Sequence, residues 1–168
     1  MSDDRNQPLG EVEAPEGTRF AIVWSRFNHH IVSKLLVGAQ DCFSERGVAD
    51  DSIYVVEVPG AWELPYAAHQ LAQSKKFSAV VALGAIVRGG TPHFDYVSEG
   101  TALGLGRVSL DTGVPVVFGV LTTDDDAQAL DRAGGAHGNK GRDAALTAIE
   151  MAAFNGKLSD DGITTKRP

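Results

Sequence analysis

The chain has little cysteine, no long apolar run and few basic residues, and each shortage excludes a class of protein. A single cysteine excludes a framework of internal disulfides. No segment approaches the roughly 18 consecutive apolar residues that a membrane-spanning helix needs, and the polar, acidic start of the chain does not have the composition of a signal peptide. With 15 Lys and Arg against 22 Asp and Glu the net charge is −7, whereas sequence-independent binding to nucleic acid needs a basic face. We therefore expect a cytoplasmic protein that binds neither membrane nor nucleic acid.

Two features that often mark chemistry have ordinary explanations here. Cys42 lies near Asp41 and Glu45, and a reactive thiolate needs electropositive neighbours, so we expect a buried structural thiol. His29 and His30 are adjacent, and adjacent side chains on a helix point about 100° apart, which is poor geometry for chelation. We expect no metal site.

Strand-like apolar runs alternate with helical patterns along the chain. The near-continuous apolar strands predict a parallel sheet covered by helices on both faces, an α/β fold. We expect one domain at 18–157, a mobile N-terminal arm at 1–17 and a flexible tail at 158–168. The expected strands are 20–24, 53–58, 79–83 and 114–120. The first expected helix faces the core through Ile31, Leu35, Ala39 and Phe43 and ends at Gly47. The other expected helices are a short one after Gly60, two at about 94–110 and 124–132, and a last one that ends at Gly156.

Ligands of such sheets bind beyond the carboxyl ends of the strands, so the residues that follow each strand are the candidates for a binding site. After the first strand, Phe27 is placed to stack on a flat ring and Asn28 to hydrogen-bond to a ligand. Alternatively, Phe27 packs inward and Asn28 caps the next helix. The spacing does not decide between the two interpretations.

After the second strand comes the segment 59–65. Gly60 and Ala61 allow a ligand to approach the backbone closely, Trp62 supplies a large ring, and Glu63 supplies a hydrogen-bond acceptor. On these residues alone, an ordinary strand-to-helix turn with a first-turn glutamate is the favoured interpretation.

The strongest local signal follows the third strand, in the segment 84–93. Gly89, Gly90 and Thr91 precede a helix, whose first backbone N–H groups have no intrahelical partner and are therefore suited to an anion. His93 lies beside this cradle and is suited to general acid–base catalysis near neutral pH. The alternative is a plain turn with a histidine at the start of a helix.

Three further residues have competing interpretations. The position of Phe118 on the fourth strand favours burial in the core. Arg132 would suit a phosphate, because guanidinium binds it bidentately, and Lys140 is a second cation nearby. For both cations the alternative is a solvated surface position.

Taken in order and spacing, these segments resemble the lumazine synthase family over roughly residues 18–156. The segments that carry the resemblance are 26–28 (Arg-Phe-Asn), 59–65 (Pro-Gly-Ala-Trp-Glu-Leu-Pro), 84–97, 118–123, 132–134, 138–141 and 148–151. The resemblance implies a single-domain, three-layer α/β/α sandwich whose mostly parallel four-stranded sheet has flavodoxin-like order. It also implies the reaction of 5-amino-6-(D-ribitylamino)uracil with 3,4-dihydroxy-2-butanone 4-phosphate, giving 6,7-dimethyl-8-ribityllumazine, phosphate and water in riboflavin biosynthesis, with no metal or redox cofactor.

The resemblance assigns roles position by position. His93 is the acid–base residue, and Phe27 stacks on the pyrimidine. In this family the site lies between subunits, and a neighbour contributes the Phe118 and Arg132 positions. The remaining expected contacts are Asn28, Ala61, Trp62, Glu63, Ala85, Ile86, Val87, Phe118 and Lys140 for the pyrimidine and ribityl chain, and Gly90, Thr91 and Arg132 for the phosphate.

The family also implies an assembly. Its members form pentamers, some of which build icosahedral shells of 60 subunits, and riboflavin synthase is an expected partner. A short glycine-rich linker between the last two helices favours the shell, and residues 134–139 form one here. Two positions depart from the family pattern: Trp62 stands where many members have Phe, and Ala136 stands where shell-forming members often have Lys.

Three rival functions remain at this point. A non-catalytic flavin- or lumazine-binding protein would keep the stacking residues but would not need His93 or the phosphate residues. A structural shell protein is compatible with catalysis. A phosphosugar enzyme of similar fold would not need the aromatic side chains of Phe27 and Trp62.

Overall fold

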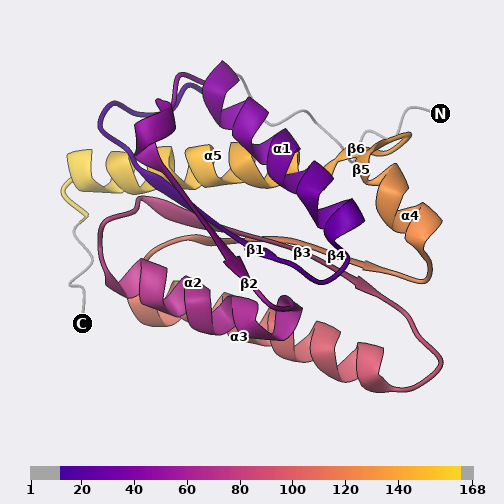
Figure 1. Cartoon of the computed structure of the whole chain (residues 1–168). Coiled ribbons are helices and arrows are strands. Elements are labelled where there is room, and N and C mark those ends of the chain that lie inside the picture. Colours follow the sequence, from indigo (N-terminus) through magenta and orange to yellow (C-terminus); the bar gives the residue numbers. More distant parts are fainter. Residues whose placement is uncertain (1–11, 164–168) are drawn as a thin grey trace, which may run out of the picture.

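A computed structural model describes residues 12–163 as a parallel sheet between two layers of helices (Figure 1). The sheet has four strands in the order β2-β1-β3-β4, and every neighbouring pair is parallel. This order is the flavodoxin-like one, so the predicted fold is confirmed. In chain order the elements are β1 (Phe20–Ser25), α1 (His29–Glu45), the 3-10 helix η1 (Asp50–Ser52), β2 (Ile53–Val58), the 3-10 helix η2 (Ala61–Glu63), α2 (Leu64–Gln73), β3 (Ala79–Val87), α3 (His93–Thr112), β4 (Val116–Thr123), α4 (Asp126–Asp131), β5 (Ala133–Gly135), β6 (Gly138–Asn139) and α5 (Lys140–Asp160).

The two faces of the sheet are covered by different helix pairs. Helices α1 and α5 lie on one face, and α2 and α3 lie on the other (Figure 1). Along the central strand β3, Val81 and Leu83 belong to the first core, whereas Val80 and Ala82 belong to the second. This alternation follows from the period of two along a strand, and burial on both faces explains why the sequence of β3 is apolar throughout.

Strand β3 is longer than predicted and runs through Gly84 to Val87. Glycine often ends a strand, but here the small residue is required by close packing. A Cβ at Gly84 would lie 3.0 Å from Ser25 Oγ and 3.2 Å from Leu64 Cδ1. As a consequence, Ala85 and Ile86 are strand residues at the carboxyl edge of the sheet.

The last helix also differs from the prediction, because α5 passes through Gly156 and ends at Asp160. Gly113, just after α3, and Gly47, near the end of α1, have positive φ values of 69° and 81°, the conformation that ends a helix. Gly156 does not adopt it. The linker before α5 pairs β5 with β6 as a small antiparallel hairpin, which the sequence did not predict.

The structure describes only part of the two terminal segments. Residues 1–11 of the expected arm and 164–168 of the expected tail lie outside the described residues. Val12 and Ala14 pack against the core on the α1 face, and the Ala14 N–H donates to the Arg46 carbonyl at 3.3 Å. Cys42 is fully buried in the same core, and burial raises the pKa of its thiol. Within residues 12–163, no helix is both long enough and apolar enough to cross a membrane.

Candidate active site

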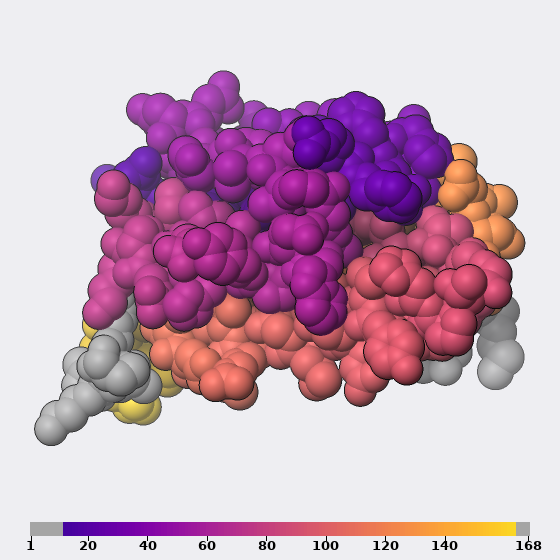
Figure 2. All heavy atoms as spheres, turned by 60° about the horizontal axis from the view of Figure 1, so that its bottom comes forward, coloured from indigo at the N-terminus to yellow at the C-terminus, as the bar shows by residue number. Residues whose placement is uncertain are grey.

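A cavity of about 750 Å³ lies at the carboxyl end of the sheet, between the β1–α1 loop, η2, the end of β3 and the start of α3. We call it the aromatic cavity. Seen from the side of α2 and α3, the segment around residue 60 adjoins the start of α3 (Figure 2). Eight of the residues predicted for the site line this cavity: Phe27, Asn28, Ala61, Trp62, Glu63, Ile86, Val87 and His93.

Phe27 is held at the mouth of the cavity by its backbone. The N–H groups of Arg26 and Phe27 donate to the carbonyls of Val58 (2.8 Å) and Pro59 (3.0 Å), which extends the pairing of β1 with β2. Asn28 then takes a left-handed conformation, with φ of 59°. Its side chain caps no helix; Nδ2 donates instead to the Ala85 carbonyl at 2.8 Å. The Phe27 side chain is 72% exposed, so it does not pack inward and is available to stack on a ring.

Trp62 also lines the aromatic cavity and is 60% exposed. The backbone of η2 is tied to α3 because Thr101 Oγ1 donates to the Ala61 carbonyl at 3.2 Å. The indole lies against α3 where there is no side chain: a Cβ at Gly100 would be 2.2 Å from Trp62 Cζ3. Gly100 therefore sets how closely the Trp62 ring approaches the helix.

The glycine-rich loop after β3 leaves several donors free. Gly89, Gly90 and Thr91 are exposed, and their backbone N–H groups donate to no other described residue. The hydroxyl of Thr91 accepts from the N–H of His93 at 3.4 Å, and His93 is the first residue of the 20-residue helix α3. Free N–H groups at the start of a long helix form a site suited to an anion, and the His93 side chain lies beside it.

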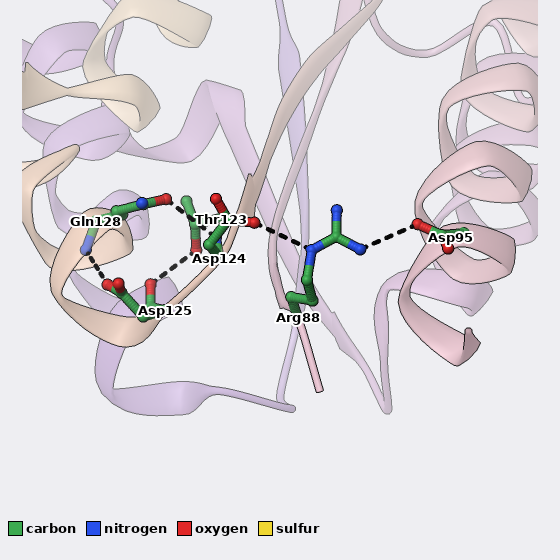
Figure 3. A network of polar contacts seen from close by, with 6 residues as sticks. All are labelled: Arg88, Asp95, Thr123, Asp124, Asp125 and Gln128. Atoms are coloured by element: carbon green, nitrogen blue, oxygen red, sulfur yellow. Dashed lines mark hydrogen bonds and ion pairs between the residues drawn. The ribbon is translucent and has the colours of Figure 1, made fainter. Parts of the chain in front are cut away.

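Arg88 is a residue of this region that sequence reasoning missed. Its Nε donates to Asp124 Oδ1 at 3.0 Å and its Nη1 to Asp95 Oδ1 at 3.3 Å (Figure 3). The guanidinium carbon also lies 4.3 Å from the centre of the Phe94 ring. The hydrogen bond to Asp124 is the main cause that raises the pKa of Arg88 above its ordinary value. No pattern in one sequence pairs Arg88 with an aspartate 36 residues away.

Six predicted residues do not line the aromatic cavity. Ala85 is buried in β3, and Gly90 and Thr91 are exposed on the loop before α3. The other three, Phe118, Arg132 and Lys140, lie elsewhere on the chain. They line a separate groove of about 810 Å³ along the edge strand β4, bordered by α3 and α5, which we call the edge groove. Arg132 is half-buried there and its Nη1 donates to the Gln128 carbonyl at 3.0 Å, while Lys140 pairs with Asp143 at 2.8 Å. Phe118 is 46% exposed and is therefore not a core residue. One chain thus carries the expected site as two separate parts.

The adjacent histidines have unrelated neighbours. His30 Nε2 lies 3.0 Å from Asp126 Oδ2, whereas the His29 ring lies 5.4 Å from the Trp24 ring. In residues 12–163, no group of three or more His, Cys, Asp or Glu side chains is placed to hold a metal ion.

Comparisons with known proteins agree on one family. Residues 17–155 match the family model described as 6,7-dimethyl-8-ribityllumazine synthase. Proteins named 6,7-dimethyl-8-ribityllumazine synthase from two strains of Clostridium kluyveri are each 53% identical to the chain over 137 residues, which are 82% of this chain and 89% of theirs.

Proposed function

Because the chain belongs to the 6,7-dimethyl-8-ribityllumazine synthase family, we propose that its aromatic cavity and its edge groove are the two halves of that enzyme's active site. The enzyme condenses 5-amino-6-(D-ribitylamino)uracil with 3,4-dihydroxy-2-butanone 4-phosphate. The products are 6,7-dimethyl-8-ribityllumazine, phosphate and water, on the route to riboflavin.

The reaction requires a flat binding region for the pyrimidine, a polar one for the phosphorylated ketone, and a group that transfers protons. The 5-amino group of the pyrimidine attacks the ketone and loses water to give an imine. Inorganic phosphate then leaves, and the ribitylamino nitrogen closes the second ring with loss of water. Each step moves protons between carbon, nitrogen and oxygen, and a positioned histidine accelerates such transfers near neutral pH.

The aromatic cavity suits the pyrimidine. Phe27 offers an exposed ring for stacking, and Trp62 adds a second exposed ring to the lining of the cavity. The backbone of Ile86 and Val87, at the end of β3, provides polar groups for the ring edge, and Glu63 provides an acceptor for ribityl hydroxyls. Ala85 acts indirectly, because its carbonyl holds the Asn28 side chain. His93 lies on the same cavity, so we assign to its imidazole the proton transfers at the amine and the ketone.

The phosphate binds between the free N–H groups of Gly90 and Thr91 and an arginine. Arg132 of the same chain lines the edge groove rather than the aromatic cavity. We therefore assign the arginine, with Phe118 and Lys140, to a neighbouring copy whose edge groove faces this cavity. The observation that carries the proposal is that the expected residues are divided between the aromatic cavity and the edge groove.

Exposed apolar groups support an assembly of this kind. Tyr96, Leu103 and Leu110 recur at seven-residue intervals on α3 and are 73%, 67% and 87% exposed, a spacing typical of helices that pack against other helices. Strand β4 is an edge strand, and the groove beside it is lined in part by the exposed apolar side chains of Phe118 and Met151. We propose a cytoplasmic pentamer, with twelve pentamers forming a shell and riboflavin synthase as a partner.

Mixing the purified protein with both substrates tests the function. We expect lumazine absorbance and fluorescence to rise well above the rate of the uncatalysed condensation. A protein that binds lumazine without accelerating its formation would instead be the non-catalytic binding protein, and the proposed function would be wrong.

A further inference from the structure

We propose that Arg88 is a positioning residue for this reaction, which fixes His93 relative to the phosphate-binding loop. The inference rests on the proposed function, because it concerns the same site. It assigns a role to a side chain outside the expected set of substrate contacts.

Arg88 ties together three segments at the carboxyl end of the sheet: the end of β3, the first turn of α3 and the residue after β4. It directly follows β3, and its backbone N–H donates to the Thr123 carbonyl at 2.9 Å, which extends the pairing with β4. Its side chain then bridges Asp95, in the first turn of α3, and Asp124, just after β4 (Figure 3). The loop 89–92 therefore begins at Arg88 and ends at a helix that the Arg88 side chain holds.

This bridge acts on the geometry of catalysis. Asp95 lies two residues after His93, and Phe94, between them, has its ring against the guanidinium. The loop itself has little else to fix it: a Cβ at Gly89 or Gly90 would meet nothing within 4 Å. Without Arg88, the loop and the first turn of α3 would sample more arrangements, and each would separate His93 from the bound phosphate.

Arg88 is poorly suited to bind the phosphate itself. Its guanidinium is already hydrogen-bonded to two carboxylates, which offset its charge and occupy two of its five N–H donors. Arg132, in contrast, pairs with no carboxylate among residues 12–163 and donates to a backbone carbonyl. Arg88 is thus the cation that organises the loop, and Arg132 is the cation that is free to bind an anion.

The same network continues toward the second half-site. The Asp124 N–H donates to Gln128 Oε1 at 3.0 Å, and the Gln128 N–H donates to Asp125 Oδ1 at 2.8 Å (Figure 3). The Gln128 carbonyl accepts from Arg132. Arg88 is therefore joined by hydrogen bonds both to the helix that begins with His93 and to the turn that presents Arg132.

Steady-state kinetics of Arg88→Met test the role, with Arg107→Met as a matched control. Arg107 is on α3, forms an exposed ion pair with Asp111 at 3.0 Å and lines neither the aromatic cavity nor the edge groove. For Arg88→Met we expect KM for the phosphorylated ketone to rise about tenfold and kcat to fall several-fold, because small misplacements are costly in catalysis. KM for the pyrimidine and the melting temperature should match the control. Arg88→Lys should recover only part of the loss, since an ammonium is a point charge without a planar fork.

The Asp95→Asn variant separates positioning from direct phosphate binding by the sign of its effect. Positioning predicts a higher KM for the ketone, because the bridge is weakened. Direct binding predicts a lower KM, because a guanidinium is released toward the phosphate. A lower KM, or an Arg88→Met enzyme that behaves like the control, would overturn the inference. Wild-type protein in the same assay tests the proposed function separately, because an inactive wild type would contradict that function and not the role of Arg88 alone.

Discussion

At the scale of single residues, His93 is the group on which the chemistry depends most. Its side chain lies on the aromatic cavity, next to the free N–H groups of the loop 89–91. We expect His93→Ala to lower kcat by roughly 10²-fold or less, since substrate positioning survives and only proton transfer is lost. Initial rates at saturating concentrations of both substrates measure this. An unchanged kcat would remove His93 from the mechanism.

A second residue-scale prediction concerns the contact of Trp62 with Gly100. A methyl group at position 100 would collide with the indole, and an indole at the end of a flexible side chain is displaced more easily than helix backbone. We expect Gly100→Ala to raise KM for the pyrimidine about tenfold with little change in KM for the ketone. Adding Trp62→Phe should restore the pyrimidine KM, because the smaller ring leaves room for the methyl group.

Gly106→Ala is the matched control for this contact. It lies on the same helix, and a Cβ there would meet nothing within 4 Å. We expect wild-type kinetics for Gly106→Ala. If the double variant were no better than Gly100→Ala alone, the contact with Trp62 would not be what sets the pyrimidine affinity.

At the scale of elements, the close approach of α1 and α5 depends on Gly141. A Cβ there would lie 1.9 Å from the Leu35 carbonyl oxygen, and backbone cannot rotate away as a side chain can. We expect Gly141→Ala to lower the free energy of unfolding by about 1–3 kcal/mol or more. In the same helix, a Cβ at Gly156 would meet nothing within 4 Å, so Gly156→Ala should raise it by about 0.5–1 kcal/mol.

Urea unfolding curves of the two alanine variants measure this difference directly. Both substitutions increase helix propensity equally, so propensity alone predicts the same sign for each. Equal stabilisation by both would contradict the packing of α1 against α5 through Gly141.

The sequence predicted best those helices and strands that depend on local interactions. The apolar runs of the strands and the inward face of α1 are local patterns, and both were predicted. The bounds of β1 and β2 were correct to within one residue, whereas β3 and β4 both extend further than predicted at their carboxyl ends. Gly84 and Gly156 were wrongly predicted to end their strand and helix. A glycine ends such an element only if its φ or its packing requires it, and a sequence shows neither.

The candidate site was likewise predicted only in part. Phe27, Trp62 and His93 were found because each follows a strand, and the carboxyl ends of parallel strands meet at one edge. Arg88 was missed because its partners, Asp95 and Asp124, are defined by the fold and not by spacing. The separation of Arg132 from His93 likewise depends on the order of the strands, which places β4 at the edge of the sheet.

At the scale of the whole molecule, the linker before α5 bears on the size of the assembly. Gly134 and Gly138 have φ values of 107° and 74°, which glycine adopts at little cost and other residues rarely adopt. The linker therefore keeps the compact form that we associate with a closed shell. Light scattering should give a particle of about 60 subunits of 17.7 kDa each. The mass of a single pentamer across pH and phosphate concentration would contradict the shell and leave the catalytic account intact.

The central claim is that each active site combines the aromatic cavity of one chain with the edge groove of another. Alone, Arg132→Ala should raise KM for the phosphorylated ketone far more than KM for the pyrimidine, and His93→Ala should lower kcat. The decisive measurement is the activity of mixed assemblies of the two variants, formed by joint refolding and verified by native mass spectrometry. In a ring of head-to-tail contacts, random mixing leaves about one site in four with both native side chains, so we predict activity well above that of either variant alone. Activity equal to the average of the two variants, in assemblies shown to be mixed, would place His93 and Arg132 in a site within one chain and contradict the claim.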